Sequence, residues 1–475
     1  MKKRIVISTL FSFLLSCLLM AHSNDNKILI LSVNDMHASF EKLPRLKHLA
    51  DSLRCLYPNM LVLSAGDNRT GNPFSDQYPI ASLPMTELMN YVGFDASAIG
   101  NHDFDAKVNG FIDMIKHSHF PYLSANVELP DSLKGWLKPY QTFTMRNGMR
   151  IGVMSLLQLN DKGIPDTDPN NVEGVRFLPA METIEQYRSL REECDVLLML
   201  THLGYEVDLQ IAEKYANFAD IIVGGHSHTK IDGGVTRNGV LITQAENKLK
   251  YATVTTIETD GKKITSKKAE LVDLGTIAPD KGAEALVKHF SENDELNQVI
   301  GSLNEPIRDT ETLACLMGES WIDETHSEVA VINYGNVRIQ ELPAGDIRLS
   351  DIYRLDPYDN DVIQVMLTKG ELEDLLLACY RADEAKLPFL IGAKYEAVMD
   401  SLNPTQVRRV VLKGLPKNSS KLYRVVTSSY VMRISKFQHR CEAQKQGMKC
   451  NALMIQHVKR VKHITRPKCD NVTTK

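Results

Sequence analysis

The sequence Ser97-Ala98-Ile99-Gly100-Asn101-His102-Asp103-Phe104-Asp105 joins an apolar run to a dense group of polar side chains. The run at residues 96–99 predicts the end of a buried strand, and Gly100 allows a sharp turn directly after it. An amide, an imidazole and two carboxylates follow within five positions. A single strand end of this kind is ordinary turn chemistry, so its meaning depends on the other strand ends of the chain.

Four more apolar runs in the first half of the chain end in a similar way, at residues 28–33, 60–64, 195–200 and 220–223. Each run is followed within three residues by Asp or His. Between the first two runs, leucines recur at helical spacing over residues 43–56. Strands that alternate with helices and end on polar residues predict an α/β fold with a site along one sheet edge.

The polar residues at these strand ends are of the types that bind divalent metals. Carboxylate, amide and imidazole ligands together suit zinc, manganese or iron better than calcium. The set is larger than one tetrahedral ion can use, which favours two metal ions. Its members are Asp35, His37, Asp67, Asn101, His102, Asp105, His202, His226 and His228.

Length and charge limit the function classes. A chain of 475 residues is too long for one ordinary core, so two domains are expected. A formal net charge of -4 argues against a nucleic acid polymer as partner. The sequence carries no indication of oligomeric state.

The first 23 residues have the pattern of a secretory signal peptide. Lys2, Lys3 and Arg4 precede an apolar run at residues 5–20, which is too short and wrongly flanked for a membrane span. Residues 14–17 also resemble a lipoprotein box, in which Cys17 would be lipidated and would anchor the protein to a membrane. Either route predicts an exported protein, periplasmic or at the cell surface.

Seven cysteines follow this segment, an odd number without closely spaced pairs. Their spacing predicts neither a zinc knuckle nor a disulfide framework. Cys441, Cys450 and Cys469 lie near one another in the tail, which leaves a pairing there open.

Taken in order, five motifs of residues 27–273 resemble the calcineurin-like metallophosphoesterase superfamily. The additional patterns Phe104-Asp105 and Asp67-x-x-x-Gly71-x-Pro73 resemble its bacterial 5′-nucleotidase and UDP-sugar hydrolase branch. The five motifs are Asp35-Met36-His37, Gly66-Asp67-Asn68, Gly100-Asn101-His102-Asp103, Thr201-His202 and Gly225-His226-Ser227-His228.

The resemblance implies an α/β architecture with two domains. A four-layer α/β-sandwich metallophosphoesterase domain is expected at residues 24–275, after a signal peptide at 1–23. A linker helix at 276–303 then leads to a smaller α/β substrate-binding domain at 304–475.

The resemblance also implies a role for each polar residue. Asp35, His37, Asp67 and His228 are expected to hold the first metal, although many relatives have glutamine in place of His228. Asp67, Asn101, His202 and His226 are expected to hold the second metal, with Asp67 as the bridge. His102 is expected over the substrate phosphate, oriented by Asp105, while Asp103 is structural.

The second half of the chain resembles the substrate-binding domain of 5′-nucleotidases. The resemblance implies that Asn333 lies at the pocket, that Arg338 contacts the phosphates or the ribose, and that Tyr358 stacks on the base. Two family features are absent. Glu311 occupies the place of an arginine, and no Gly-Gly-Asp turn follows Tyr430. Tyr430 and Phe437 are alternative candidates for a second stacking ring.

These features predict an exported phosphohydrolase with two divalent metal ions that removes phosphate from nucleoside 5′-monophosphates by attack of metal-activated hydroxide. UDP-sugars and 2′,3′-cyclic nucleotides are further expected substrates. One alternative is a phosphatase of the same mechanism that acts on a non-nucleotide ester. Another is a catalytically inert relative that binds a small ligand.

Overall fold

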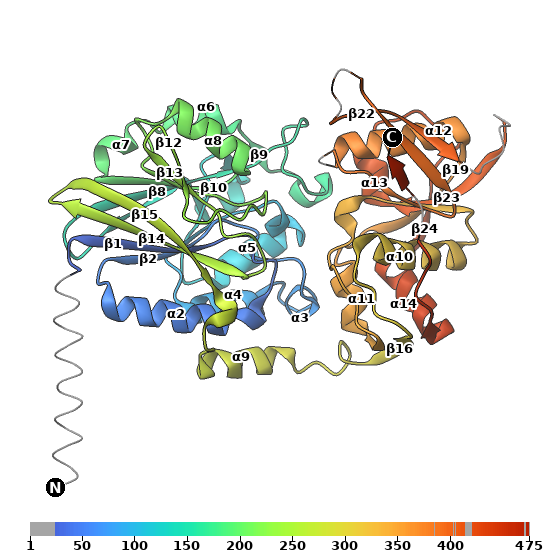
Figure 1. The fold of residues 1–475 in the computed structure, drawn as a ribbon, viewed down its shortest axis with the longest axis horizontal. Helices are drawn as coiled ribbons and strands as arrows, with labels where there is room; N and C mark the ends of the chain where they lie inside the picture. The colour runs from blue at the N-terminus through green and yellow to red at the C-terminus, as the bar shows by residue number, and fades with distance from the viewer. Residues whose placement is uncertain are drawn as a thin grey trace, which may run out of the picture. The chain divides into compact units, whose positions relative to one another are not determined.

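The computed structural model describes residues 24–383, 385–401, 403, 405–413, 420–469 and 472–474. The predicted signal peptide at residues 1–23, with Cys17, lies outside this part of the chain. Within it, every helix is too short or too polar to span a membrane. The chain divides into two compact units, one of residues up to 292 and one of residues 293–475, the latter with Gly71–Pro73 (Figure 1).

The first unit contains a seven-stranded sheet in which β1, β2, β3, β4 and β6 run parallel. A long antiparallel hairpin, β14–β15, closes one edge by pairing β14 with β1. In spatial order the strands are β15 (Lys263–Asp273), β14 (Tyr251–Asp260), β1 (Lys27–Val33), β2 (Met60–Ser64), β3 (Ala96–Ala98), β4 (Tyr122–Leu123) and β6 (Leu137–Lys138).

A six-stranded sheet forms the other half of this unit. Its four central strands, β13, β11, β10 and β8, are parallel, and both edge strands are antiparallel to their neighbours. In spatial order the strands are β12 (Val235–Arg237), β13 (Val240–Thr243), β11 (Ile221–Val223), β10 (Val196–His202), β8 (Arg150–Leu157) and β7 (Tyr140–Thr144).

The two sheets pack face to face over one core. Ile28 and Ile30 of β1 belong to the same buried cluster as Val153 of β8 and Leu198 of β10. The opposite face of the six-stranded sheet packs under α6 (Ala180–Gln186), α7 (Leu190–Glu193) and α8 (Tyr205–Lys214). Figure 1 shows α2 (Leu43–Leu56) on the outer side of the seven-stranded sheet. Helix α2 packs against α4 (Leu83–Val92), which in turn packs against α5 (Lys107–His117). The predicted four-layer α/β sandwich is therefore confirmed.

The helix expected at residues 276–303 is shorter than predicted. Helix α9 (Lys281–Ser291) starts where the side chain of Asp280 accepts a hydrogen bond from the amide of Ala283 at 2.8 Å, and it packs on α2 and α4. After it a separate turn begins at Asn293, whose side chain accepts from the amide of Leu296 at 2.9 Å and whose carbonyl oxygen accepts from the amide of Asn297 at 3.0 Å. The chain then enters strand β16 (Val299–Leu303).

The second unit is a smaller α/β assembly. Its five-stranded sheet has the order β20 (Phe389–Ile391), β17 (Val329–Ile332), β23 (Leu422–Ser428), β19 (Asp361–Thr368) and β24 (Gln444–Lys449). Helix α12 (Lys369–Ala382) shares a buried core with this sheet. Helices α10 (Thr310–Thr325) and α14 (Cys450–Val461) pack against each other.

Two three-stranded sheets complete the second unit, together with α11 (Leu349–Leu355) and α13 (Ser429–Ile434). One contains β18 (Gly345–Arg348), β16 and β25 (His463–Ile464). The other contains β22 (Val407–Lys413), β21 (Lys394–Met399) and β26 (Val472–Thr474). A disulfide joins Cys315 of α10 to Cys469, with a Cα–Cα distance of 6.2 Å. Of the tail cysteines whose pairing was left open, Cys469 thus pairs with a cysteine 154 residues earlier in the chain. Cys441 and Cys450 are free thiols.

Candidate metal centre

Each predicted metal ligand lies at the carboxyl end of a parallel strand. Asp35 and His37 follow β1, Asp67 follows β2, and Asn101 follows β3 in the seven-stranded sheet. His202 is the last residue of β10, and His226 and His228 follow β11 in the six-stranded sheet. The carboxyl ends of parallel strands meet at one edge of a sheet. The face-to-face packing of the two sheets brings both edges together.

The backbone at these strand ends is unusual. Five of the predicted ligands have left-handed φ values although none is glycine: Asp35 (49°), His37 (45°), Asp67 (52°), His226 (77°) and His228 (53°). Such conformations cost about 1–3 kcal/mol each and concentrate at functional sites. The fold holds these residues in strained conformations that turn their side chains toward one another.

Glycines allow the strand ends to approach closely. A Cβ atom at Gly100 would lie 2.0 Å from Oδ1 of Asp67, and one at Gly66 would lie 2.7 Å from the amide nitrogen of Gly100. Gly66 also has a φ of +90°, which favours glycine. The loops after β2 and β3 can therefore meet only without side chains at these two positions.

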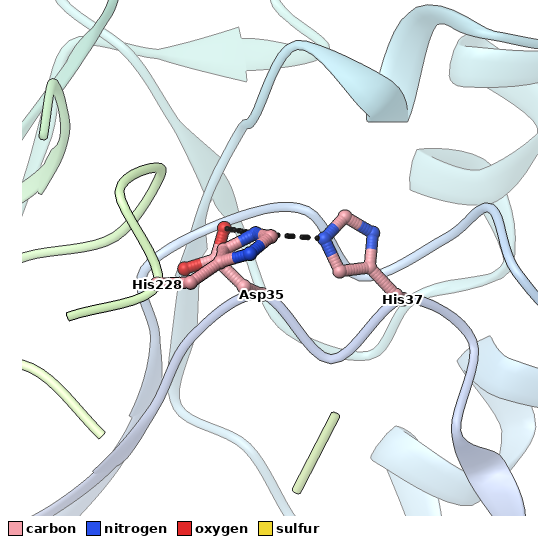
Figure 2. A group of neighbouring side chains, drawn as sticks. All are labelled: Asp35, His37 and His228. Carbon is pink, nitrogen blue, oxygen red and sulfur yellow. Dashed lines mark hydrogen bonds and ion pairs between the residues drawn. The ribbon is translucent and has the colours of Figure 1, made fainter. Parts of the chain in front are cut away.

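The first group of possible ligands consists of Asp35, His37 and His228, whose ligand atoms lie within 4.8 Å of one another. Figure 2 shows the rings of His37 and His228 pointing toward one another beside the carboxylate of Asp35. The two Nε2 atoms are 3.1 Å apart, and Nε2 of His228 is 3.4 Å from Oδ1 of Asp35. Two imidazole nitrogens and a carboxylate oxygen directed at one position suit a divalent cation.

The second group consists of Asp35, Asp67 and His202. Nδ1 of His202 is 2.7 Å from the carbonyl oxygen of Ala65, which can only accept, so Nδ1 carries a proton. The opposite nitrogen, Nε2, lies 3.3 Å from Oδ2 of Asp67 and 3.9 Å from Oδ1 of Asp35. A backbone carbonyl that orients a histidine in this way is typical of a metal ligand.

Asn101 connects this second group to His226. Its Nδ2 donates to the carbonyl oxygen of Asp166 at 2.9 Å, which turns Oδ1 the other way. Oδ1 lies 3.2 Å from Nε2 of His202 and 3.1 Å from Nδ1 of His226. Since Oδ2 of Asp67 is also 3.9 Å from Nε2 of His37, all seven predicted ligands form one continuous cluster.

The charges in this cluster are strongly coupled. Burial acts against the charged form of Asp67, but His202, His102 and His37 together hold the pKa of this carboxyl well below its usual range. Burial acts against protonation of His202, yet Asp67 and Asp35 raise the pKa of His202 to about 10. Positive charge nearby therefore stabilises the buried carboxylates, and divalent cations can supply it in place of protons.

His102 and Asp105 lie beside the cluster. Nδ1 of His102 is 2.8 Å from Oδ2 of Asp105, and the backbone amide of His102 donates to Oδ1 of Asp67 at 2.8 Å. The ring centroid of His102 is 5.2 Å from that of His37. Asp103 is buried and accepts from the amides of Gly100 and Asn68 at 2.8 and 3.0 Å, so it ties two site loops together.

The predicted substrate residues lie in the second unit. Asn333 follows β17, and its Nδ2 donates to Asp383 at 3.4 Å. The hydroxyl of Tyr358 donates to the carbonyl oxygen of Gly335 at 3.4 Å, so Asn333 and Tyr358 belong to neighbouring loops. Arg338 is half-buried and donates its backbone amide to the carbonyl oxygen of Leu355 at 3.1 Å.

Two contacts of the cluster were not predicted from the sequence. Nδ2 of Asn247 lies 2.9 Å from Nδ1 of His228. Asp166, whose carbonyl orients Asn101, follows strand β8 in a polar loop and receives side-chain hydrogen bonds from Gln158 and Asn160. The polar loop after β8 was a recognisable signal, since every other site loop also follows a parallel strand. Asn247 follows β13, another parallel strand of the six-stranded sheet, so the same signal could have found it.

Carboxylates, imidazoles and an amide gathered at the carboxyl edges of two packed sheets define a metallophosphoesterase. Residues 28–230 match the calcineurin-like phosphoesterase family, and residues 292–437 match the 5′-nucleotidase C-terminal domain. This chain belongs to the family that combines these two domains.

Relatives of known name match over most of the chain. Protein UshA of Yersinia enterocolitica is 28% identical, over 85% of this chain and 84% of that protein. The 5′-nucleotidase of Rattus norvegicus is 24% identical, over 86% and 82%. A crystal structure of a 5′-nucleotidase precursor from Thermus thermophilus superposes with a TM-score of 0.81 at 22% identity, covering 94% of this chain and 99% of that one, and supports the fold.

Membership in this family establishes the class of reaction. The chain is a metal-dependent phosphoric ester hydrolase of the nucleotide phosphoesterase and 5′-nucleotidase family. Calcineurin-like metallophosphoesterases bind two divalent metal ions, and the oxygen and imidazole donors of the cluster fit such ions.

Proposed function

We propose that this chain is an exported hydrolase with two metal ions that releases phosphate from nucleoside 5′-monophosphates. UDP-sugars and 2′,3′-cyclic nucleotides are further candidate substrates. The observation that carries the proposal is the continuous cluster of seven donor side chains. In this cluster the carboxylate of Asp67 lies between His37 of the first group and His202 of the second.

In this proposal, Asp35, His37, Asp67 and His228 hold one metal ion. Asp67, Asn101, His202 and His226 hold the other. Oδ2 of Asp67 lies 3.9 Å from Nε2 of His37 and 3.3 Å from Nε2 of His202, which supports Asp67 as the shared ligand. When bound, two divalent ions supply Lewis acidity that activates water and neutralises charge on the phosphoryl oxygens.

His102 supplies the proton in this proposal. Asp105 accepts from Nδ1 of His102, which orients the ring and stabilises its protonated form. As the bond between phosphorus and the ester oxygen breaks, the proton on the opposite nitrogen passes to the leaving oxygen. The position of the ring beside His37 supports this role, because His37 belongs to the first metal group.

We further propose that residues 24–275 carry the chemistry and residues 304–475 recognise the substrate. Relatives named 5′-nucleotidase support a nucleoside monophosphate as the substrate. In the second unit, Asn333 and Arg338 would contact its polar groups. The ring of Tyr358 would stack on the base, since an aromatic face accepts any base.

Export is supported by two independent features. Residues 1–23 have the pattern of a signal peptide. The disulfide between Cys315 and Cys469 is typical of proteins from oxidising compartments. Lipidation at Cys17 would place the mature protein on a membrane surface.

A substrate panel tests the proposal. The mature chain, with its metals quantified, is assayed for phosphate release from AMP, UDP-glucose, 2′,3′-cyclic AMP and p-nitrophenyl phosphate. Each assay is repeated after EDTA and after readdition of manganese or zinc. We expect EDTA-sensitive release with a preference for AMP. Activity without preference for AMP would favour a phosphatase for non-nucleotide esters. Inactivity on every ester after reconstitution would favour a binding protein.

A further inference from the structure

The loop after strand β8 supports the candidate site from one side. Asp166 receives the amide hydrogen bond of Asn101, as described above. The next residue, Thr167, is buried, and its side chain reaches Asp105, which is 62 residues earlier in the chain. Two consecutive residues of one loop thus contact both a predicted metal ligand and the predicted proton-transfer pair.

The hydrogen bonds of Thr167 fix the direction of its hydroxyl proton. Nδ2 of Asn171 is 3.2 Å from Oγ1 of Thr167 and can only donate, so Oγ1 accepts there. The single proton of the hydroxyl is then directed at Oδ1 of Asp105, which lies 3.2 Å away. Asp105 therefore receives a hydrogen bond from Thr167 on one oxygen.

The other oxygen of Asp105 faces His102. Oδ2 lies 2.8 Å from Nδ1 of His102. With both oxygens engaged, the carboxylate cannot rotate away from the imidazole without losing the bond to Thr167. The backbone of His102 is held separately, because its amide donates to Asp67 and its carbonyl oxygen accepts from Thr70.

Within the loop this hydroxyl accepts a hydrogen bond from Asn171, and other bonds form the turns before and after it. A backbone hydrogen bond of 2.8 Å joins Asn160 to Ile164 within the loop. The short helix η4 (Pro169–Val172) is capped by the side chain of Asp168, which accepts from the amide of Asn170 at 3.0 Å. The contact between Thr167 and Asp105 is thus additional to the bonds that form the turn.

We infer that Thr167 is a positioning residue for His102 that acts through Asp105. The inference rests on the proposed function, in which His102 gives a proton to the leaving oxygen. Without the hydroxyl, Asp105 is free to turn and His102 loses its orientation toward that oxygen. Esters with a poorly acidic leaving group, such as AMP, depend on the proton donor, whereas p-nitrophenyl phosphate does not.

The test compares Thr167→Val with the wild type, Thr167→Ser and a control. Thr167→Val keeps the shape of the side chain and removes the hydroxyl, and Thr167→Ser restores it. Thr183→Val is the matched control, because Thr183 of α6 is buried and donates to the carbonyl oxygen of Pro179, the residue before this helix. For each protein we measure bound metals, melting temperature, and kcat and KM for AMP and for p-nitrophenyl phosphate.

We expect Thr167→Val to keep its metals and its melting temperature while kcat for AMP falls roughly tenfold or more with unchanged KM. The kcat for p-nitrophenyl phosphate should fall less than about twofold, because nitrophenol leaves without a proton donor. Thr167→Ser should recover most of the AMP rate. In an Asp105→Ala background, Thr167→Val should add almost no further loss.

An equal loss on both esters, or a Thr167→Ser variant as slow as Thr167→Val, would overturn the inference. So would a full additional loss in the Asp105→Ala background. If Thr167→Val lowers the melting temperature, Thr167→Ala provides a second variant without the hydroxyl. A wild type that hydrolyses none of the esters refutes the proposed function, whereas an active wild type with an equally active Thr167→Val refutes only the inference.

Discussion

The Nε2 atoms of His37 and His228 lie 3.1 Å apart although the two histidines are separated by 191 positions in the chain. Their strands, β1 and β11, belong to different sheets. Oδ1 of Asp35 lies 3.4 Å from Nε2 of His228, so three donor atoms converge where the two sheet edges meet.

Removing one of these donors should release one metal ion. We expect His228→Ala to lower the metal content from about two ions per chain toward one, because the first ion loses a ligand while the second keeps its own. Elemental analysis after gel filtration measures this change. His48→Ala, an exposed histidine of α2, is the control. A His228→Ala protein with undiminished metal would remove His228 from the ligand set.

His102→Ala should separate metal binding from turnover. Since His102 is not one of the seven proposed ligands and its Nδ1 faces Asp105, the variant should keep both ions. Its kcat for AMP should fall by about 10²–10⁴-fold, the usual effect of losing a proton-transfer group. Metal analysis and steady-state kinetics on the same preparation check both parts. Loss of metal would mean that His102 is a ligand.

Tyr358 should affect recognition of the base and not the chemistry. We expect Tyr358→Ala to raise KM for AMP by roughly tenfold, because base stacking contributes about 1–3 kcal/mol. Tyr358→Phe keeps the ring and should behave like the wild type. KM for ribose 5-phosphate, which has no base, is the internal control. A parallel rise for both esters would indicate a general distortion of the second unit.

The disulfide between Cys315 and Cys469 should stabilise the second unit. It closes a long segment of 154 residues, so Cys469→Ser should lower the free energy of unfolding by about 2–5 kcal/mol. Urea unfolding with and without reductant measures the effect, and reductant should change the wild type but not the variant. Cys441→Ser, which removes a free thiol, should resemble the wild type.

Asp208 should make stability depend on pH. It is fully buried and accepts from the hydroxyl of Thr201 at 2.7 Å, and burial raises the pKa of its carboxyl to about 7. The folded state therefore binds more protons than the unfolded chain between about pH 4 and pH 7. The contribution of Asp208 to stability is present below this window and declines as the pH rises through it, by at most about 1.4 kcal/mol per unit.

Asp208→Asn cannot lose a proton and should flatten that decline. Urea unfolding at a series of pH values from 5 to 8 compares the two proteins. The unfolding free energy of Asp208→Asn, measured relative to that of the wild type, should increase as the pH rises. Parallel curves for the two proteins would show that Asp208 is already ionised in the folded state.

Much of the fold and of the candidate site was predictable from local sequence. Short apolar runs followed by Asp or His predicted the strand ends that carry Asp35, Asp67 and His202. This succeeded because a buried parallel strand is apolar throughout, and the loop after it is free to carry polar groups. The end of α9 at Ser291 was missed: a separate turn begins at Asn293, whose side chain and carbonyl oxygen accept from the amides of Leu296 and Asn297.

Only the tertiary structure decided which of these residues meet. Strand order within each sheet, and the packing of one sheet on the other, bring His37 to His228 and Thr167 to Asp105. The fold of the second unit brings Cys315 to Cys469. Local sequence determines where a strand ends and which chemistry follows it, since these depend on near neighbours. Contacts over long separations depend on how buried surfaces pack together, and no short pattern encodes that outcome.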